Sequence, residues 1–213
     1  MLATVLAVLD GLGIVVFAVT GALVASRKQM DIVGFALLAI VTGVGGGTLR
    51  DLLLGSTPVF WVREPASVLI CAAVAAITFF TAHIPQSRYN WVLWLDAVGL
   101  AVFTVIGAET ALKGGASLPV ACVMGVITAT FGGIIRDILG GESPIILRRE
   151  IYVTAALLGA LMLVALLGLG VPRDAAVGAG FAAAFGLRGA ALTWHWSLPR
   201  YKSRVARSYE QER

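Results

Sequence analysis

The stretch GGGTLRDLLLG covers residues 45–55, and FGGIIRDILGG covers residues 131–141. Each places glycines and an arginine–aspartate pair inside an otherwise apolar sequence. The aspartate of the second motif follows that of the first by 137 − 51 = 86 residues. A motif that recurs within a chain of 213 residues predicts an internal repeat.

The repeat extends beyond the two motifs. LDGLGIVVFAVTGA (9–22) aligns without a gap with LDAVGLAVFTVIGA (95–108), so Asp10 corresponds to Asp96. Roughly a third of positions 9–64 are identical to their counterparts 86 residues later, far above chance even for two apolar segments.

The composition indicates an all-α integral membrane protein. Hydrophobic residues make up 59% of the chain and charged residues 13%, whereas soluble domains are about half apolar and a quarter charged. A bilayer core requires about 20 apolar residues per helix. Seven such spans are predicted, at about 2–25, 31–49, 66–84, 91–112, 118–135, 151–171 and 174–196. The N-terminus has no positive region or cleavage site of a signal peptide, so we interpret it as the first span.

The chain is therefore predicted to form one membrane domain, residues 1–213, built from two copies of three helices. Repeat one covers about 5–85 and repeat two about 91–171, followed by a seventh helix at about 174–196 and a basic tail, 197–213. Because three is odd, the second copy enters the membrane in the opposite sense. The copies are then related by a pseudo-two-fold axis in the membrane plane.

The basic residues outside the two motifs predict the orientation. One side carries Arg27, Lys28, Arg88, Arg148, Arg149, Arg200, Lys202, Arg204, Arg207 and Arg213, and the other carries Arg63, Lys113 and Arg173. The positive-inside rule places the C-terminus in the cytoplasm and the N-terminus outside. The tail favours contact with anionic lipid over nucleic-acid binding, and Arg188, Arg200 and Lys202 are the predicted lipid-binding residues.

Glycine runs disfavour a helix by about 1 kcal/mol per residue relative to alanine. An interrupted helix in a bilayer is tolerated where protein packs around it or where it lines a wet cavity. We therefore predict that the second and fifth spans are broken or kinked at the glycines and line an ion path. The alternative interpretation is close helix packing. The predicted path residues are Asp10, Thr42, Gly45, Gly46, Gly47, Arg50, Asp51, Asp96, Thr128, Gly132, Gly133, Arg136 and Asp137.

Neighbouring residues on a helix point in different directions, so the arginine and aspartate of each motif are not expected to pair. Because charges at membrane depth need partners, we predict that Asp10 lies near Arg50 and Asp96 near Arg136. The alternative is that Arg–Asp merely marks a helix end at the interface. Glu109 and Lys113 are spaced to form a local pair on one helix.

The remaining candidate residues give no sign of an enzyme or a metal site. Cys71 and Cys122 fall in the middle of predicted spans and are interpreted as small buried apolar residues. His83 and His195 lie at span ends, far apart in sequence, which does not support a metal site. No nucleophile–base set falls together, and no cofactor is predicted.

GGGTLRD and FGGIIRD, on the second and fifth of seven spans, resemble the motifs of the prokaryotic branch of the TRIC proteins, the trimeric intracellular cation channels. The resemblance covers about residues 5–196. It implies a homotrimer with one pore inside each protomer and passive permeation of monovalent cations such as potassium and sodium. A prokaryotic source would place the protein in the plasma membrane.

Related bacterial sequences carry a glycine-transporter label. A secondary transporter of glycine or a similar small solute is therefore the alternative to a channel. Inverted repeats and broken helices suit both classes. A channel needs a continuous wet path lined by hydrogen-bond acceptors, whereas a transporter needs sites for a carboxylate and an ammonium group.

Overall fold

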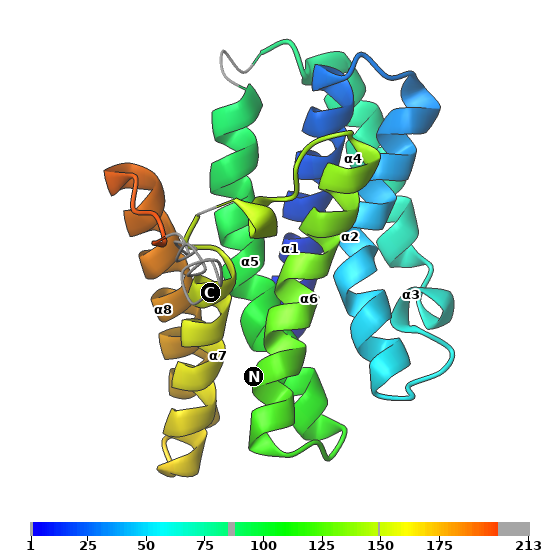
Figure 1. The fold of residues 1–213 in the computed structure, drawn as a ribbon. Helices are drawn as coiled ribbons and strands as arrows, with labels where there is room; N and C mark the ends of the chain where they lie inside the picture. Colours follow the sequence, from blue (N-terminus) through cyan, green and yellow to red (C-terminus); the bar gives the residue numbers. More distant parts are fainter. Residues whose placement is uncertain (1, 85–87, 149, 200–213) are drawn as a thin grey trace, which may run out of the picture.

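In a computed structural model of the protein, residues 2–84, 88–148 and 150–199 are described (Figure 1). The regular secondary structure of this part of the chain is helical apart from one isolated bridge between Glu150 and Ser197. The helices are α1 (Leu2–Arg27), α2 (Ile32–Leu53), α3 (Phe60–Arg63), α4 (Ala66–Thr81), α5 (Arg88–Lys113), α6 (Leu118–Leu139), the 3-10 turn η1 (Ile145–Leu147), α7 (Val153–Gly168) and α8 (Arg173–Trp194).

Each predicted span coincides with one of the longer helices, and the informative differences lie at the ends. Helices α2 and α6 continue beyond the predicted ends at 49 and 135, so Arg50 and Arg136 lie in their last turns. Gly55 and Gly141 follow with φ of +69° and +64°, a conformation that glycine adopts without steric cost and that commonly ends a helix.

The predicted break in the second and fifth spans is wrong, whereas the kink at the same glycines stays a prediction. Helices α2 and α6 are continuous α-helix through Gly45–Gly47 and through Gly132 and Gly133. The intrinsic cost of glycine in a helix is small enough for tertiary packing to override it.

Helices α1 and α5 occupy the centre of the bundle. Helix α1 packs against α2, α4 and α5, and α5 also packs against α6, α7 and α8. Where α1 and α5 meet, the rings of Phe17 and Phe103 make an edge contact with centroids 5.0 Å apart. Gly13 and Gly99 accommodate these rings, since a side chain at either position would meet the phenylalanine of the other helix.

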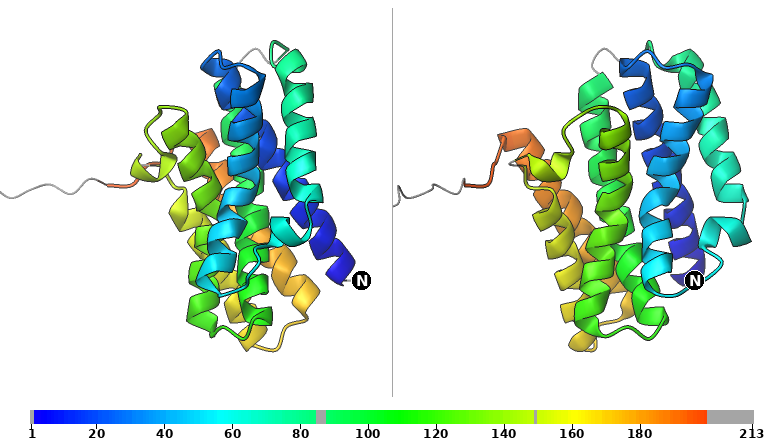
Figure 2. Two further views of the ribbon diagram at one scale, coloured as in Figure 1. Left: turned by 90° about the vertical axis from the view of Figure 1, so that its right-hand side faces the viewer. Right: turned by 45° about the vertical axis from the view of Figure 1, so that its right-hand side comes forward.

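Figures 1 and 2 show α1 and α5 running in opposite directions, as do α2 and α6. Residues at the same place in the two copies of the repeat therefore lie toward opposite ends of the bundle.

Five of the described helices, α1, α2, α5, α6 and α8, are long and apolar enough to cross a membrane. Helices α4 and α7 are apolar but have 16 residues each. Many large apolar side chains are exposed on the bundle, among them Val33 (70%), Leu69 (68%) and Phe80 (72%). Exposed apolar surface of this extent suits a lipid environment, and the protein is an all-helical membrane protein.

Candidate functional site

The first motif ties the end of α2 to the start of α3. Arg50 donates from Nε and Nη2 to Asp51 Oδ1 at 2.9 and 2.7 Å. Asp51 Oδ2 accepts the backbone N–H of Phe60, the first residue of α3, at 2.8 Å. The guanidinium carbon also lies 5.8 Å from the centroid of the Phe60 ring.

The second motif repeats this arrangement between α6 and η1. Arg136 Nε donates to Asp137 Oδ1 at 2.9 Å, and Nη2 lies 2.8 Å from the same oxygen. Asp137 Oδ2 accepts the backbone N–H of Ile145, the first residue of η1, at 3.0 Å. The prediction that adjacent arginine and aspartate do not pair is therefore wrong, because the long arginine side chain bends back to its neighbour.

The two motifs differ in the third group that the arginine contacts. Arg136 Nη1 donates to Asp96 Oδ1 at 2.7 Å and to Thr20 Oγ1 at 3.0 Å. This contact confirms the pairing of Asp96 with Arg136. Among the described ion pairs Arg50 contacts Asp51 alone, but Asp10 lies within electrostatic range of Arg50, so the proximity of Asp10 and Arg50 stays a prediction.

Burial differs between the two arginines but not between the two motif aspartates. The side chains of Arg136 and Asp96 are completely buried, and that of Asp137 is 4% exposed. Those of Arg50 and Asp51 are 8% and 3% exposed. Buried ion pairs need additional hydrogen bonds to offset the loss of hydration, and Thr20 supplies one of them at Arg136.

Tyr152 is a residue of this region that the sequence analysis missed. It is 1% exposed. A side-chain carbon added to Gly133 would lie 2.9 Å from the Tyr152 hydroxyl and 3.4 Å from Asp96 Oδ1. Gly133 therefore leaves room for the hydroxyl beside the Arg136–Asp96 pair. Because Tyr152 corresponds to Ala66 in the first copy, the repeat gave no signal for it.

The glycines of the motifs lie where α2 and α6 cross. A side-chain carbon at Gly46 would overlap the carbonyl oxygen of Thr128, and one at Gly132 would overlap that of Thr42. The backbones thus touch at two matched points, which supports close packing as one role of these glycines. At their neighbours, an added carbon at Gly45 would meet the side chain of Ile135, and one at Gly47 would meet that of Phe60.

Thr42 and Thr128 are buried at this crossing. Their hydroxyls donate to carbonyl oxygens one turn back in their own helices, those of Leu38 and Met124. Both hydroxyls therefore have hydrogen-bond acceptors within their own continuous helices.

One other predicted contact differs in the structure. Glu109 is 1% exposed and pairs with Arg173 at 3.0 Å, not with Lys113 on its own helix. Arg188 is 1% exposed and pairs with Glu150 at 2.7 Å, and its binding of lipid stays a prediction. Arg200 and Lys202, the other predicted lipid-binding residues, lie outside the described residues.

The cysteines and the side chains that could bind a metal are the remaining candidate residues. Cys71 and Cys122 are free and buried, as predicted. Within the described residues, no group of three or more His, Cys, Asp and Glu side chains is placed to hold a metal ion. The buried charged groups described above are arginine–carboxylate pairs.

Comparison with known proteins identifies a family model and a bacterial inner membrane protein that match most of this chain. A family model described as Glycine transporter matches residues 7–83 and 93–168. The UPF0126 inner membrane protein YadS of Escherichia coli K12 is 42% identical over 195 residues, which cover 91% of this chain and 94% of the relative.

Solved structures extend the comparison to the fold. A TRIC trimeric intracellular cation channel orthologue from Rhodobacter sphaeroides is similar with a TM-score of 0.89 and 67% identity, covering 91% of this chain and all of that one. A structure described as the structural basis for conductance through TRIC cation channels has a TM-score of 0.83 and 36% identity, with 93% and 98% coverage.

Proposed function

This chain belongs to the UPF0126 family, it matches a Glycine transporter model, and it is similar to prokaryotic TRIC channels; on that premise we propose that it is a passive channel for monovalent cations, chiefly potassium. Similarity to TRIC cation channels over nine-tenths of the chain supports a cation channel and a non-enzymatic role. The alternative, a secondary transporter of glycine, has no structural observation in its favour.

The observation that carries the proposal is the charge of the buried Arg136 group. One guanidinium contacts two carboxylates, those of Asp96 and Asp137. With all three ionised the group has a net charge of about −1, which in a low-dielectric interior attracts cations and repels anions. Rings and clusters of carboxylates serve this purpose in cation channels.

We further propose that the path runs within each protomer, along α2 and α6 and past the two arginine–aspartate motifs. The predicted path residues at the α2–α6 crossing are tightly packed, so opening requires α2 and α6 to separate or bend at Gly46 and Gly132. Glycine positions permit such bending because no side chain has to be displaced.

The proposed topology has seven spans, with α4 and α7 completing their crossings through flanking residues, and two inverted three-helix repeats. The proposed assembly is a homotrimer in the inner membrane, with the N-terminus outside and the C-terminus in the cytoplasm. The relatives support this, since YadS is named an inner membrane protein and the R. sphaeroides orthologue a trimeric channel. Cross-linking of protein in native lipid should stop at three subunits, and alkaline phosphatase fused to the C-terminus should be inactive.

The decisive experiment is recording from purified protein in a planar bilayer under a tenfold KCl gradient. A cation channel should give unitary currents that reverse near about 59 mV, with the sign expected for potassium. Asp137→Asn and Asp96→Asn should move the reversal potential toward zero. Bilayers without currents, combined with saturable glycine uptake into vesicles, would contradict the channel proposal and favour the transporter.

A further inference from the structure

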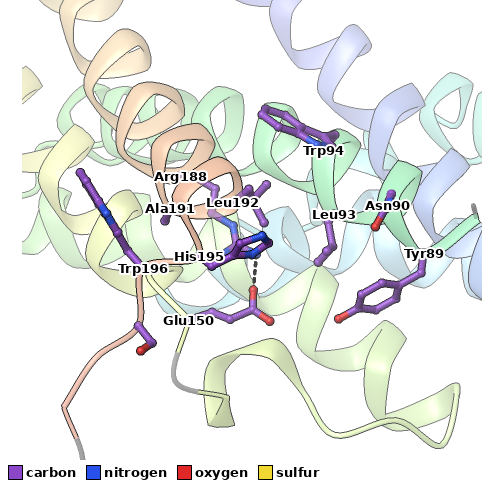
Figure 3. A pocket seen from close by; sticks show the side chains of 11 residues that line it. Tyr89, Asn90, Leu93, Trp94, Glu150, Arg188, Ala191, Leu192, His195 and Trp196 are labelled. Carbon is purple, nitrogen blue, oxygen red and sulfur yellow. Dashed lines mark hydrogen bonds and ion pairs between the residues drawn. The ribbon is translucent and has the colours of Figure 1, made fainter.

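A cavity of about 490 Å³ opens at the end of the bundle where α5 begins and α8 ends (Figure 3). Its lining includes Tyr89 and Trp94 from α5, Glu150 from the segment before α7, and Arg188, His195 and Trp196 from the end of α8. The volume lies within the range of about 300–1,000 Å³ that is usual for small-molecule sites. It far exceeds what a single inorganic ion requires.

The backbone of the segment after α8 builds one wall of this cavity. His195 ends α8 in the left-handed conformation, with φ of 55°. The backbone N–H of the next residue, Trp196, donates a hydrogen bond to the Ala191 carbonyl at 3.1 Å. Ser197 pairs with Glu150 in the isolated bridge. A left-handed conformation is uncommon for a residue with a side chain and tends to occur at functional sites.

The cavity is lined by a carboxylate, Glu150, and by the arginine that neutralises it, Arg188, and of the two the carboxylate is the more exposed. Arg188 is 1% exposed; its Nη2 and Nη1 donate to Glu150 Oε2 at 2.7 Å and to the Ile151 carbonyl at 3.1 Å, and its buried Nε has no hydrogen-bond partner among the described residues. The Glu150 side chain is 28% exposed. Figure 3 shows its carboxylate facing His195, with Tyr89 turned toward the same space. A carboxylate can accept about four hydrogen bonds, so the Arg188 contact leaves acceptor capacity.

Aromatic side chains complete the lining. Trp94 and Trp196 are 44% and 48% exposed. The Tyr89 hydroxyl accepts a hydrogen bond from Arg148 Nη1 at 2.7 Å, and the Tyr89 ring lies 5.0 Å from the Arg27 guanidinium, so its position is fixed from outside the cavity. Aromatic faces beside a carboxylate are the usual recognition elements for organic ammonium groups.

From this combination we infer that the cavity is a binding site for an organic ammonium group, with Glu150 as its counter-ion and Trp94 and Trp196 as its aromatic walls. A primary ammonium group has three N–H donors for the acceptors of the cavity. Such a group reaches this position either on a soluble amine or on the headgroup of an aminophospholipid. The inference does not rest on the proposed ion path, although Arg188 of the cavity lies 5.3 Å from the centroid of the Tyr152 ring beside the Arg136–Asp96 pair.

Binding is tested first with ethanolamine added to purified protein in detergent, followed by tryptophan fluorescence and melting temperature. We expect saturable binding that raises the melting temperature. Glu150→Gln should weaken it at least about tenfold, since a charge-assisted contact is lost. The matched control is Glu142→Gln, because Glu142 is also a partly buried carboxylate paired with an arginine, Arg27, but does not line the cavity.

The lipid source is tested by native mass spectrometry of protein in nanodiscs containing phosphatidylethanolamine or phosphatidylglycerol. Retention of phosphatidylethanolamine without ethanolamine binding assigns the site to a headgroup, and ethanolamine binding assigns it to a soluble amine. Because Glu150→Gln strands Arg188 and endangers folding, Trp94→Leu and Trp196→Leu provide a second test, each expected to weaken binding about two- to fivefold. Absence of both kinds of binding overturns the inference, as does binding that none of these three variants weakens.

Discussion

The carboxylate of Asp96 lies 2.7 Å from the guanidinium of Arg136, and both side chains are completely buried although they are 40 residues apart in the chain. Asp10, the counterpart of Asp96 in the first copy of the repeat, has no such contact with Arg50. The repeat therefore supplies a matched pair of positions at which the same residue has different partners.

Asp96→Asn should destabilise the protein by about 3 kcal/mol. This is the lower end of the cost of breaking a buried ion pair, because Asp137 still neutralises Arg136. Asp10→Asn should change stability by no more than about 0.5 kcal/mol, as is usual away from specific contacts. Reversible unfolding in mixed micelles measures both. Equal effects of the two variants would contradict the assignment of Asp96 as a structural partner.

Gly46→Ala and Gly132→Ala should each destabilise the protein by about 1–3 kcal/mol, because the added methyl group overlaps a carbonyl oxygen of the facing helix. Gly11→Ala is the control, since an added carbon there has no neighbour within 4 Å. It should be neutral or stabilising by up to about 1 kcal/mol through helix propensity. Thermal unfolding compares the three variants. Neutral substitutions at the crossing would show that α2 and α6 are not packed backbone to backbone in solution.

Asp51→Asn and Asp137→Asn should loosen the segments that follow α2 and α6. One oxygen of each carboxylate accepts a backbone N–H at the start of α3 or η1, and the other holds the arginine. An amide side chain has one acceptor oxygen and cannot serve both. Hydrogen exchange should accelerate around Phe60 in the first variant and around Ile145 in the second. Unchanged exchange in both segments would rule out this anchoring role.

Arg173→Ala should cost about 1–3 kcal/mol, the usual penalty for leaving a buried acceptor such as Glu109 without its partner. Lys113→Ala should stay within about 0.5 kcal/mol. Chemical unfolding distinguishes the two. A larger effect of the Lys113 variant would restore the local pair that the sequence favours.

The sequence predicted the helices and the Asp96–Arg136 contact. Both predictions depend on patterns that extend over many residues, namely the long apolar segments and the internal repeat. The sequence-based predictions failed where one residue from a distant part of the chain determines a contact. Lys113 is four residues from Glu109, but Arg173 comes to Glu109 only when α8 packs against α5. The glycines predicted a break, yet in the structure each lies against a backbone carbonyl of the facing helix, within an unbroken helix. Their contact partners lie 82 or 90 residues away in sequence, at Thr128 and Thr42.

The unequal charge of the two arginine–aspartate motifs has an electrical consequence. The motifs lie toward opposite ends of the bundle, and of the two only the group around Arg136 has a third ionic partner, Asp96. An ion entering from one face would meet the balanced Arg50–Asp51 pair first, whereas an ion entering from the other would meet the group with the additional carboxylate first. Two unequal barriers in series give a conductance that depends on the sign of the membrane potential, so protein inserted in one orientation should rectify.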